Sequence, residues 1–214
     1  MEKAIIRTFG RTHGKKLSKR QQWLIDNILP KLDPSKNAIS KITGNILEIG
    51  FGAGEHLMEL ALQNPNKIII GAEPFTNGVA SLLSHITNDN GIIKKEFKNI
   101  RIFPDDIRKL LSTTINNFIF DKIFILHPDP WPKARHEKRR LLNSEFLKQI
   151  SSFISKDAEI IIGTDHTDYY NWILEKIKAT NLKIKTTYVD IIRTRYQEKN
   201  IFKSEKTMYL VLGI

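Results

Sequence analysis

The stretch LEIGFGAGEHL, residues 47–57, decides the fold class of this chain. It joins the end of an apolar run to a turn with a glycine at every second position, and EHL then opens a segment with helical spacing. Glycine permits backbone conformations that a Cβ would forbid and lets a ligand approach the backbone closely. Taken alone, the turn fits a ligand site and an ordinary tight strand-to-helix connection equally well.

The same alternation of apolar runs and helical patterns continues along the chain. Buried strands are predicted at 45–50, 67–73, 99–103, 121–127 and 158–165, and helices at 55–63, 77–87, 105–115, between 142 and about 155, and at 169–180. Two last strands, 183–191 and 207–214, follow with no full helix between them. This order predicts an α/β fold with a mostly parallel seven-stranded sheet, helices on both faces and an antiparallel C-terminal edge.

The chain is expected to form a single domain behind a basic N-terminal arm. With 214 residues, 41% of them hydrophobic, it is long enough to bury a real core. WLIDNILPKL predicts a helix that ends near Pro30, so the arm is assigned to 1–22 and the domain to 23–214. The arm has little apolar content and is expected to be mobile without a ligand.

Composition excludes several classes of protein. The chain has no cysteine, so disulfides, thiol catalysis and cysteine-based zinc sites are ruled out. No apolar stretch approaches the roughly 20 residues that a membrane span needs. The N-terminus lacks the apolar region and cleavage site of a secretory signal. These features predict a cytoplasmic protein that does not enter a membrane, and no spacing of ligands indicates a metal site.

The net charge of +11 is concentrated in three short segments. Residues 1–20 carry +6, residues 133–140 carry +4 and residues 193–206 carry +3, which leaves about −2 for the rest of the chain. Scattered lysines would indicate only solubility, whereas clustered ones favour a polyanionic partner, most often a nucleic acid.

Acidic and glycine residues follow nearly every predicted strand, which is unlike a core-packing pattern. In open α/β sheets, ligands bind outside the carboxyl ends of the strands. Glu48 and Glu55 near the glycine turn would repel a pyrophosphate but suit a cationic ligand. Glu73 can accept both hydroxyl protons of a ribose, and Asp106 can accept from an adenine amino group. S-adenosylmethionine is such a ligand, because it is a nucleoside that carries an ammonium group and no phosphate bridge. The alternative interpretation of Glu73 is a charged residue near the start of a helix that contacts no ligand.

The stretch HPDPWPKARHEKRRLL, 127–142, places one carboxylate and three prolines ahead of a cationic run. Together with LEIGFGAGEHL, GAEPFTNGV, GTDH and TRYQ, it resembles the bacterial tRNA (guanine-N7-)-methyltransferases, from about Arg7 to the C-terminus. The resemblance implies a class I methyltransferase fold that binds S-adenosylmethionine and releases S-adenosylhomocysteine. It also implies a tRNA substrate, with guanine 46 of the variable region as the methyl acceptor.

The resemblance assigns roles residue by residue. Cofactor contacts fall on Glu48, Glu73, Asp106 and Asp129, with Gly50, Gly52 and Gly54 in the turn. Asp129 also matches the catalytic carboxylate. Substrate contacts fall on Lys133, Asp165, Thr194, Arg195, Tyr196 and Gln197, and RNA contacts on Arg135, His136, Glu137, Lys138, Arg139 and Arg140. The family has Glu where this chain has Gln197, so either Gln197 or Glu198 fills that position, and Asp105 is an alternative to Asp106.

The residue types suit methylation at N7. This nitrogen already has a lone pair, so the reaction needs positioning more than a general base, and a carboxylate can stabilise the positive charge that develops on the imidazole ring. Either Asp129 or Asp165 could instead accept from guanine N1–H and the 2-amino group. The three prolines would stiffen the loop around Asp129. Trp131 either stacks on a base or packs in the protein, and His127, His136 and His166 are interpreted as structural or RNA contacts.

Three alternatives stay open. The sequence DPW is similar to the loop of enzymes that methylate exocyclic amines, although its aromatic residue comes one position early. A non-catalytic RNA-binding protein could retain the same scaffold, and a nicotinamide dehydrogenase would need a third glycine at another place. The oligomeric state, monomer or homodimer, cannot be predicted. Deletion of residues 1–16 is expected to weaken tRNA binding and to leave cofactor binding intact.

Overall fold

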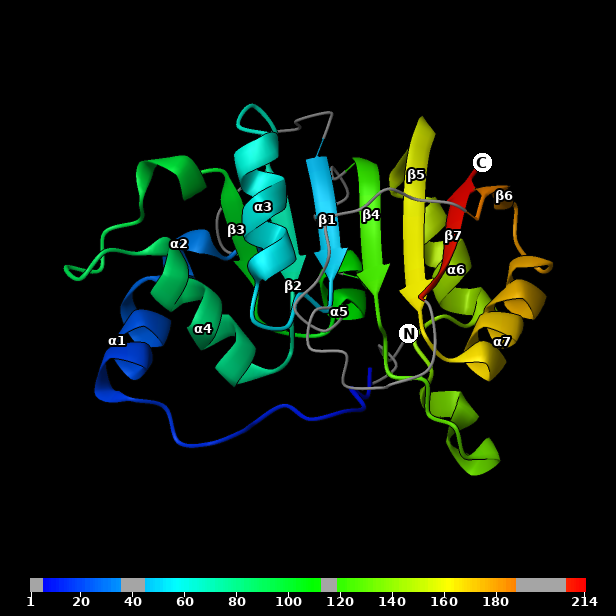
Figure 1. Cartoon of the computed structure of the whole chain (residues 1–214), viewed down its shortest axis with the longest axis horizontal. Coiled ribbons are helices and arrows are strands. Elements are labelled where there is room, and N and C mark those ends of the chain that lie inside the picture. Colours follow the sequence, from blue (N-terminus) through cyan, green and yellow to red (C-terminus); the bar gives the residue numbers. More distant parts are fainter. Residues whose placement is uncertain (1–5, 36–44, 113–118, 188–206) are drawn as a thin grey trace.

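The computed structural model describes residues 6–35, 45–112, 119–187 and 207–214. Its centre is one sheet with the strand order β3-β2-β1-β4-β5-β7-β6 in this part of the chain (Figure 1). The strands are β1 (Asn45–Ile49), β2 (Ile69–Ala72), β3 (Ile100–Phe103), β4 (Phe120–Leu126), β5 (Ile154–Thr164), β6 (Lys183–Thr186) and β7 (Met208–Gly213).

The pairing confirms the predicted mixed sheet. Strand β1 pairs in parallel with both β2 and β4, and β2 with β3 and β4 with β5 are also parallel. Strand β7 runs antiparallel to β5 and β6 and forms the C-terminal edge with β6. The chain therefore moves outward in one direction from β1 to β3 and returns to the other side of β1 with β4. The segments after β1 and β4 meet at this reversal, where open α/β sheets bind their ligands.

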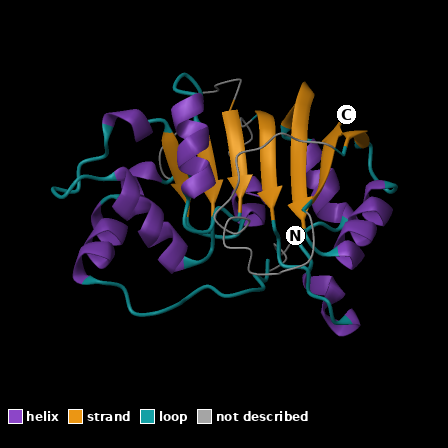
Figure 2. Ribbon diagram, in the orientation of Figure 1, coloured by secondary structure: helices purple, strands orange, loops and turns teal. Residues whose placement is uncertain are grey.

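Helices cover both faces of the sheet (Figure 2). One face carries α1 (Lys19–Asn27), α2 (Leu29–Leu32), α3 (Glu55–Gln63) and α4 (Thr76–Ile86). The other carries α5 (Ile107–Ser112), α6 (Ser144–Ser151) and α7 (Thr167–Ile177). The short helices η1 (Lys95–Phe97) and η2 (Ala134–Arg139) complete the described elements.

Two hydrophobic cores result, one beneath each helical layer. Successive residues of a strand point to opposite faces of a sheet. Ile46 of β1 accordingly packs with Leu57 and Leu82 on one side, and the next residue, Leu47, packs with Phe146 on the other. A strand buried on both faces explains why NILEI is apolar almost throughout instead of alternating.

Three predicted helix boundaries were wrong. The first helix starts at Lys19 rather than near Trp23, because Ser18 and Gln21 form a capping box there. This start lies inside the residues assigned to the arm. Pro30 does not end the helical region either, since it occupies the first turn of α2, where its missing N–H costs nothing. The helix expected to reach about residue 155 ends at Ser151, and β5 already begins at Ile154.

The described part of the arm that precedes α1, residues 6–18, crosses the carboxyl edge of the sheet as an extended segment (Figure 1). Thr12 accepts a hydrogen bond at its carbonyl from the Thr76 N–H (3.0 Å). Asn77 accepts from the Gly14 N–H (2.7 Å) and donates to the Lys15 carbonyl (2.7 Å). These bonds to the start of α4 attach the arm to the edge where a ligand is expected. No helix among the described residues combines the length and apolar character needed to cross a membrane.

Candidate active site

A cavity of about 310 Å³ opens at the carboxyl edge of the sheet, between the arm and the segments that follow β1 to β4. Four of the predicted cofactor residues line it, namely Gly50, Glu73, Asp106 and Asp129. Residues 8–11 of the arm form another part of its wall. The topology thus brings together four predicted residues that lie up to 79 positions apart in the sequence.

The glycine turn after β1 has the open geometry of a ligand cradle. Gly50 and Gly52 have φ values of 79° and 58°, which favour glycine over residues with a side chain, and a Cβ at either would meet nothing within 4 Å. Gly54 has a different role, since a Cβ there would lie 2.7 Å from a methyl group of Leu82. It lets α3 pack against α4 and does not line the cavity.

Glu73, which follows β2, is buried and held by the backbone. Its Oε2 accepts from the Gly52 N–H and its Oε1 from the Phe75 N–H, both at 2.8 Å. Burial raises the pKa of Glu73 above its ordinary value, against these two hydrogen bonds, and the negative charges of Glu48 and Asp129 add to the rise. Each carboxylate oxygen keeps a second lone pair, so both can still accept from a ligand hydroxyl.

Glu48 lies beneath the turn rather than on the wall of the cavity. It is 3% exposed, and its Oε1 is 3.2 Å from His56 Nδ1. Its Oε2 has no hydrogen-bond partner within the part of the chain that the structure describes. A buried carboxylate oxygen that lacks a hydrogen-bond partner from these residues, next to a glycine cradle, suits a ligand with a cationic group or a hydrogen-bond donor.

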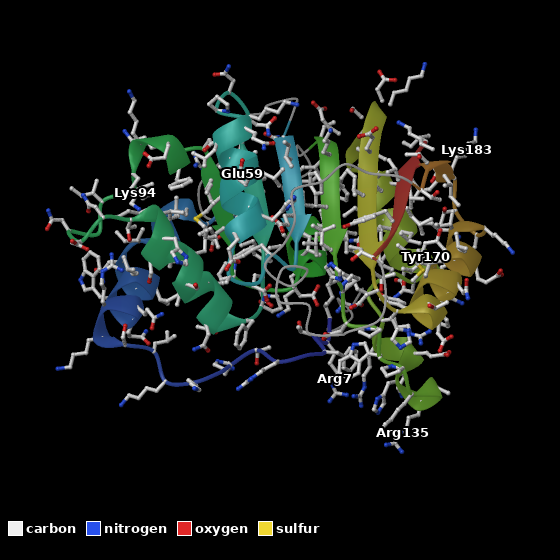
Figure 3. The ribbon with its side chains drawn as sticks, viewed as in Figure 1. Arg7, Glu59, Lys94, Arg135, Tyr170 and Lys183 are labelled. Carbon is white, nitrogen blue, oxygen red and sulfur yellow. The ribbon has the colours of Figure 1, made fainter. Side chains whose placement is uncertain are left out.

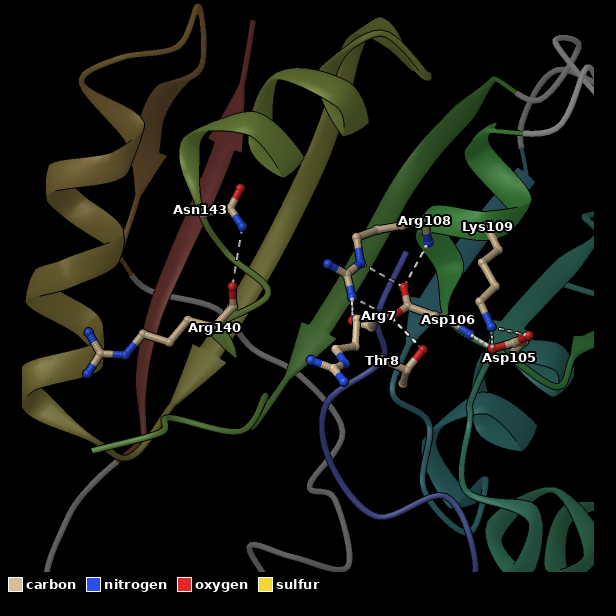
Figure 4. A network of polar contacts seen from close by, with 8 residues as sticks. All are labelled: Arg7, Thr8, Asp105, Asp106, Arg108, Lys109, Arg140 and Asn143. Carbon is tan, nitrogen blue, oxygen red and sulfur yellow. Dashed lines mark hydrogen bonds and ion pairs between the residues drawn. The ribbon is translucent and has the colours of Figure 1, made fainter. Parts of the chain in front are cut away.

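Asp106 is already engaged by protein groups (Figure 4). Arg108 donates from Nε to its Oδ1 (2.9 Å) and from Nη2 to its Oδ2 (2.6 Å), and Thr8 Oγ1 donates to Oδ2 (3.2 Å). Burial works against ionisation, but the hydrogen bonds and charge of Arg108 outweigh it and lower the pKa of Asp106. Arg108 also donates to the Arg7 carbonyl (3.0 Å), so the same guanidinium holds the arm.

Asp105 differs from its neighbour in surroundings, although both residues line the cavity. Its side chain is 40% exposed and forms an ion pair with Lys109 at 2.8 Å, whereas Asp106 is 8% exposed. The deeper position makes Asp106 the better candidate for a specific ligand contact.

The loop after β4 carries Asp129 between two residues with left-handed backbones. His127 has a φ of 49° and Trp131 a φ of 43°, unusual values for residues with large side chains. A Cβ on Gly10 of the arm would lie 3.1 Å from Asp129 Oδ2, so the arm runs directly beside this carboxylate. Partial burial raises the pKa of Asp129, even though much of the residue's surface is exposed.

The predicted substrate residues are only partly brought to the cavity. Asp165 follows β5, does not line the cavity, and has its Oδ1 4.0 Å from His127 Nδ1. Lys133 is exposed just before η2. Thr194, Arg195, Tyr196 and Gln197, and with them the choice between Gln197 and Glu198, lie outside the described residues.

The six predicted RNA residues fall into two groups. Arg135, His136, Glu137 and Lys138 lie on η2, which projects from the carboxyl edge with Arg135 at its tip (Figure 3). Arg139 and Arg140 turn toward the protein. The Arg139 guanidinium lies 5.0 Å from the Trp131 ring centroid and 5.6 Å from that of Phe9, and Arg140 is 4% exposed.

Several residues of the site were missed at the sequence level. Thr8, Phe9, Gly10 and Arg11 line the cavity, but the arm was interpreted only as a mobile RNA-binding segment. Arg108 was missed because it lies on α5 among ordinary helical residues. No local pattern marks the arm, because its contacts with Asp106 and Arg108 lie about a hundred residues away along the chain. Arg108 lies only two residues after Asp106, but this spacing forms no motif that marks a site.

The sheet order is that of the class I methyltransferase fold. Solved structures agree with this fold: "Structure of an antibiotic related Methyltransferase" has a TM-score of 0.59 at 15% identity, covering 93% of this chain and 96% of that one. "Crystal Structure of Human Methyltransferase-like protein 13 in complex with SAH" has a TM-score of 0.51 at 15% identity, covering 92% and 83%. The family model "Putative methyltransferase" matches residues 43–208.

Sequence relatives specify the family. A tRNA (guanine-N(7)-)-methyltransferase of Caulobacter vibrioides is 34% identical over 210 residues, which cover 92% of this chain and 90% of the relative. One of Zymomonas mobilis is 35% identical over 221 residues, which cover 96% and 93%. The chain belongs to the tRNA (guanine-N7-)-methyltransferase family.

Proposed function

We propose that this protein transfers a methyl group from S-adenosylmethionine to N7 of a guanine in tRNA and forms 7-methylguanosine. One observation carries the proposal. In a member of this family, Gly50 of the glycine turn, Glu73 and Asp129 line a single cavity at the reversal point of the sheet. The same cavity faces the basic segment η2, so a catalytic carboxylate and an RNA-binding surface would act together.

The described residues suit S-adenosylmethionine. Gly50 and Gly52 leave room for close approach to the backbone, and Glu73 would accept from the ribose hydroxyls. The Glu48 carboxylate, with one buried oxygen lacking a protein partner in the described part of the chain, would attract the ammonium group. Asp106 would accept a hydrogen bond from the adenine amino group after Arg108 releases one of the two Asp106 carboxylate oxygens.

Methyl transfer to guanine N7 requires that N7 be placed next to the methyl group and that the positive charge on the imidazole ring be stabilised. When bound, the cofactor supplies an electrophilic methyl group, which the N7 lone pair can take without a general base. Asp129 would stabilise the positive charge that develops on the imidazole ring, more effectively because its surroundings are partly desolvated. Asp165 or Asp129 would accept from guanine N1–H and the 2-amino group and so orient N7 toward the cofactor.

The basic segments would bind the tRNA backbone. The exposed Lys133, Arg135 and Lys138 extend from the loop that carries Asp129, so phosphate contacts there would guide the RNA to the reacting carboxylate. We place the target guanine at position 46 of the variable region, as the family resemblance implies, and the protein in the cytoplasm as a single domain, 23–214, with an arm at 1–22.

The test uses an unmodified tRNA transcript and S-adenosylmethionine with a labelled methyl group. Digestion to nucleosides should give label in 7-methylguanosine, and a transcript with adenine at position 46 should give none. Label in an N-methylated exocyclic amine would keep the fold and cofactor but replace the acceptor atom. Binding of S-adenosylhomocysteine without any labelled product would instead identify a binding protein on a methyltransferase scaffold.

A further inference from the structure

Arg140 ends the cationic run KARHEKRR, yet its guanidinium points into the protein. The residue is 4% exposed, and in Figure 4 its side chain extends from the loop toward α7. We propose that Arg140 is a positioning residue, which fixes the backbone of the Asp129 loop for the methyl transfer proposed above, and that it is not a phosphate contact. A phosphate could reach this guanidinium only if the loop came apart.

The hydrogen bonds of Arg140 go to the loop itself. Its Nε donates to the Pro130 carbonyl at 2.8 Å, and its Nη2 donates to the Trp131 carbonyl at 3.4 Å. These two carbonyls belong to the residue directly after Asp129 and the one after that. A guanidinium presents several N–H donors in a fixed planar fork, so one side chain fixes two successive peptide groups.

The two bonded carbonyls flank a strained position. Trp131 has a φ of 43°, a conformation that persists in a bulky residue only when its surroundings determine it strongly. On the other side of Asp129, His127 has a φ of 49° and its N–H donates to the Gly163 carbonyl of β5 at 2.7 Å. The catalytic loop is thus held by the sheet before Asp129 and by Arg140 after it.

The guanidinium is itself held by aromatic rings and by an acid. Its central carbon lies 4.7 Å from the Trp172 ring centroid and 5.4 Å from that of Tyr169, both on α7. Glu137 Oε1 lies 3.6 Å from Nη1. Tyr169 is fully buried, and its hydroxyl accepts from the Leu142 N–H at 3.3 Å. The contacts with the Tyr169 and Trp172 rings connect the guanidinium, and through it the loop, to α7.

The prediction separates Arg140 from the surface residues of the same run. Arg140→Lys keeps the charge but loses the planar fork, and it should lower kcat by about 100-fold, the effect of a displacement of roughly 1 Å at a reacting group. The KM for tRNA and the salt dependence of tRNA binding should stay as in the wild type. The matched control is Arg101→Lys, because Arg101 of β3 also donates to two backbone carbonyls but does not line the cavity; this variant should keep kcat. Arg140→Gln, which leaves no uncompensated buried charge, serves if the lysine variant does not fold.

Two further measurements distinguish positioning from a general loss of stability. Tyr169→Phe removes a buried hydrogen bond beside Arg140 but keeps the ring, so it should lower the melting temperature and leave kcat near the wild-type value. In Arg140→Lys, a looser loop would expose Asp129 to water. The acid limb of the kcat/KM profile should therefore move to lower pH, toward the ordinary aspartate value.

The inference is overturned if Arg140→Lys and Arg140→Gln keep the wild-type kcat. If, in addition, tRNA binding weakens and its salt slope falls by about one, Arg140 is a phosphate contact instead. If the wild-type protein itself methylates no tRNA, the proposed function fails instead. An NMR titration of the Asp129 carboxyl group in both proteins then decides the inference, because only a positioning role predicts a change in that pKa.

Discussion

At the scale of single residues, the reactive region is built from carboxylates in different environments. Glu73 accepts hydrogen bonds from two backbone N–H groups, and Asp106 forms an ion pair with Arg108. Asp129 lies on an exposed loop, and partial burial raises its pKa. Glu73 and Asp129 have raised pKa values and Asp106 a lowered one. The same side chain chemistry can therefore serve ribose binding, amine binding and charge stabilisation.

Asp129→Asn should remove the charge that stabilises the developing cation and keep the shape of the loop. We expect kcat in single-turnover methyl transfer to fall by roughly 100-fold, in line with the loss of one electrostatic contact in other active sites. The folded state should be retained, with unfolding temperature and S-adenosylhomocysteine binding as controls. Unchanged turnover would remove Asp129 from the mechanism.

The raised pKa of Asp129 also predicts a pH dependence. A group with a raised pKa takes up its proton at a higher pH, so the carboxylate form is lost as the pH falls through that value. The acid limb of kcat/KM should thus lie above 3.8, the ordinary aspartate value, and Asp129→Asn should lose this limb. The same shift disfavours folding at neutral pH, and this cost disappears as the pH falls through the raised pKa. A limb at the ordinary value in the wild type would contradict the prediction.

At the scale of elements, the arm belongs to the cavity wall as well as to the proposed RNA surface. Gly10 runs beside Asp129, Thr8 donates to Asp106, and Arg108 connects Asp106 to the Arg7 carbonyl. These contacts oppose the expectation that removal of residues 1–16 would leave cofactor binding intact. A segment that forms part of a cavity wall should contribute to what the cavity binds.

Deletion of residues 1–16 should therefore weaken S-adenosylhomocysteine binding on the order of tenfold, or ~1.4 kcal/mol, in addition to weakening tRNA binding. Calorimetry measures the first effect and a filter-binding assay the second. The matched control replaces the exposed Lys15 and Lys16 by Gln, which lowers the charge of the arm and keeps its wall residues. This control should weaken only tRNA binding. Full cofactor affinity after the deletion would restore the original expectation.

At the scale of the whole molecule, cationic groups project from the edge where the cavity opens. Arg7 and Arg135 lie at this edge in Figure 3, and Lys94 lies at a distance from it. Residues 6–18 and 133–140 each carry a net charge of +4, so a tRNA would be directed to this edge of the sheet.

Lys138→Gln should reduce the slope of log affinity against log salt by about one, because a single phosphate contact is lost. Lys94→Gln, which removes the same charge far from the cavity, should leave the slope unchanged. The two slopes are measured by tRNA titration at several salt concentrations. Equal effects of both variants would show that net charge matters and that the position of the charge does not.

The sequence by itself determined the sheet, the glycine turn and four of the residues that line the cavity. Strands and helices follow from short-range periodicity, and residues after parallel strands necessarily gather at one edge, so Gly50, Glu73, Asp106 and Asp129 could be brought together without coordinates. The glycine turn and the PDPW loop were recognisable because their chemistry is local.

Only the tertiary structure decided which partner each of these groups has. Arg108 takes the Asp106 oxygens, the arm crosses the cavity, and Arg140 turns away from its basic neighbours to hold the Asp129 loop. Thr8 and Asp106 are 98 residues apart, and Arg108 and the Arg7 carbonyl 101. The sequence does not distinguish an arginine of a basic run that faces water from one that stacks on α7. Burial depends on packing between distant elements rather than on neighbours in the chain.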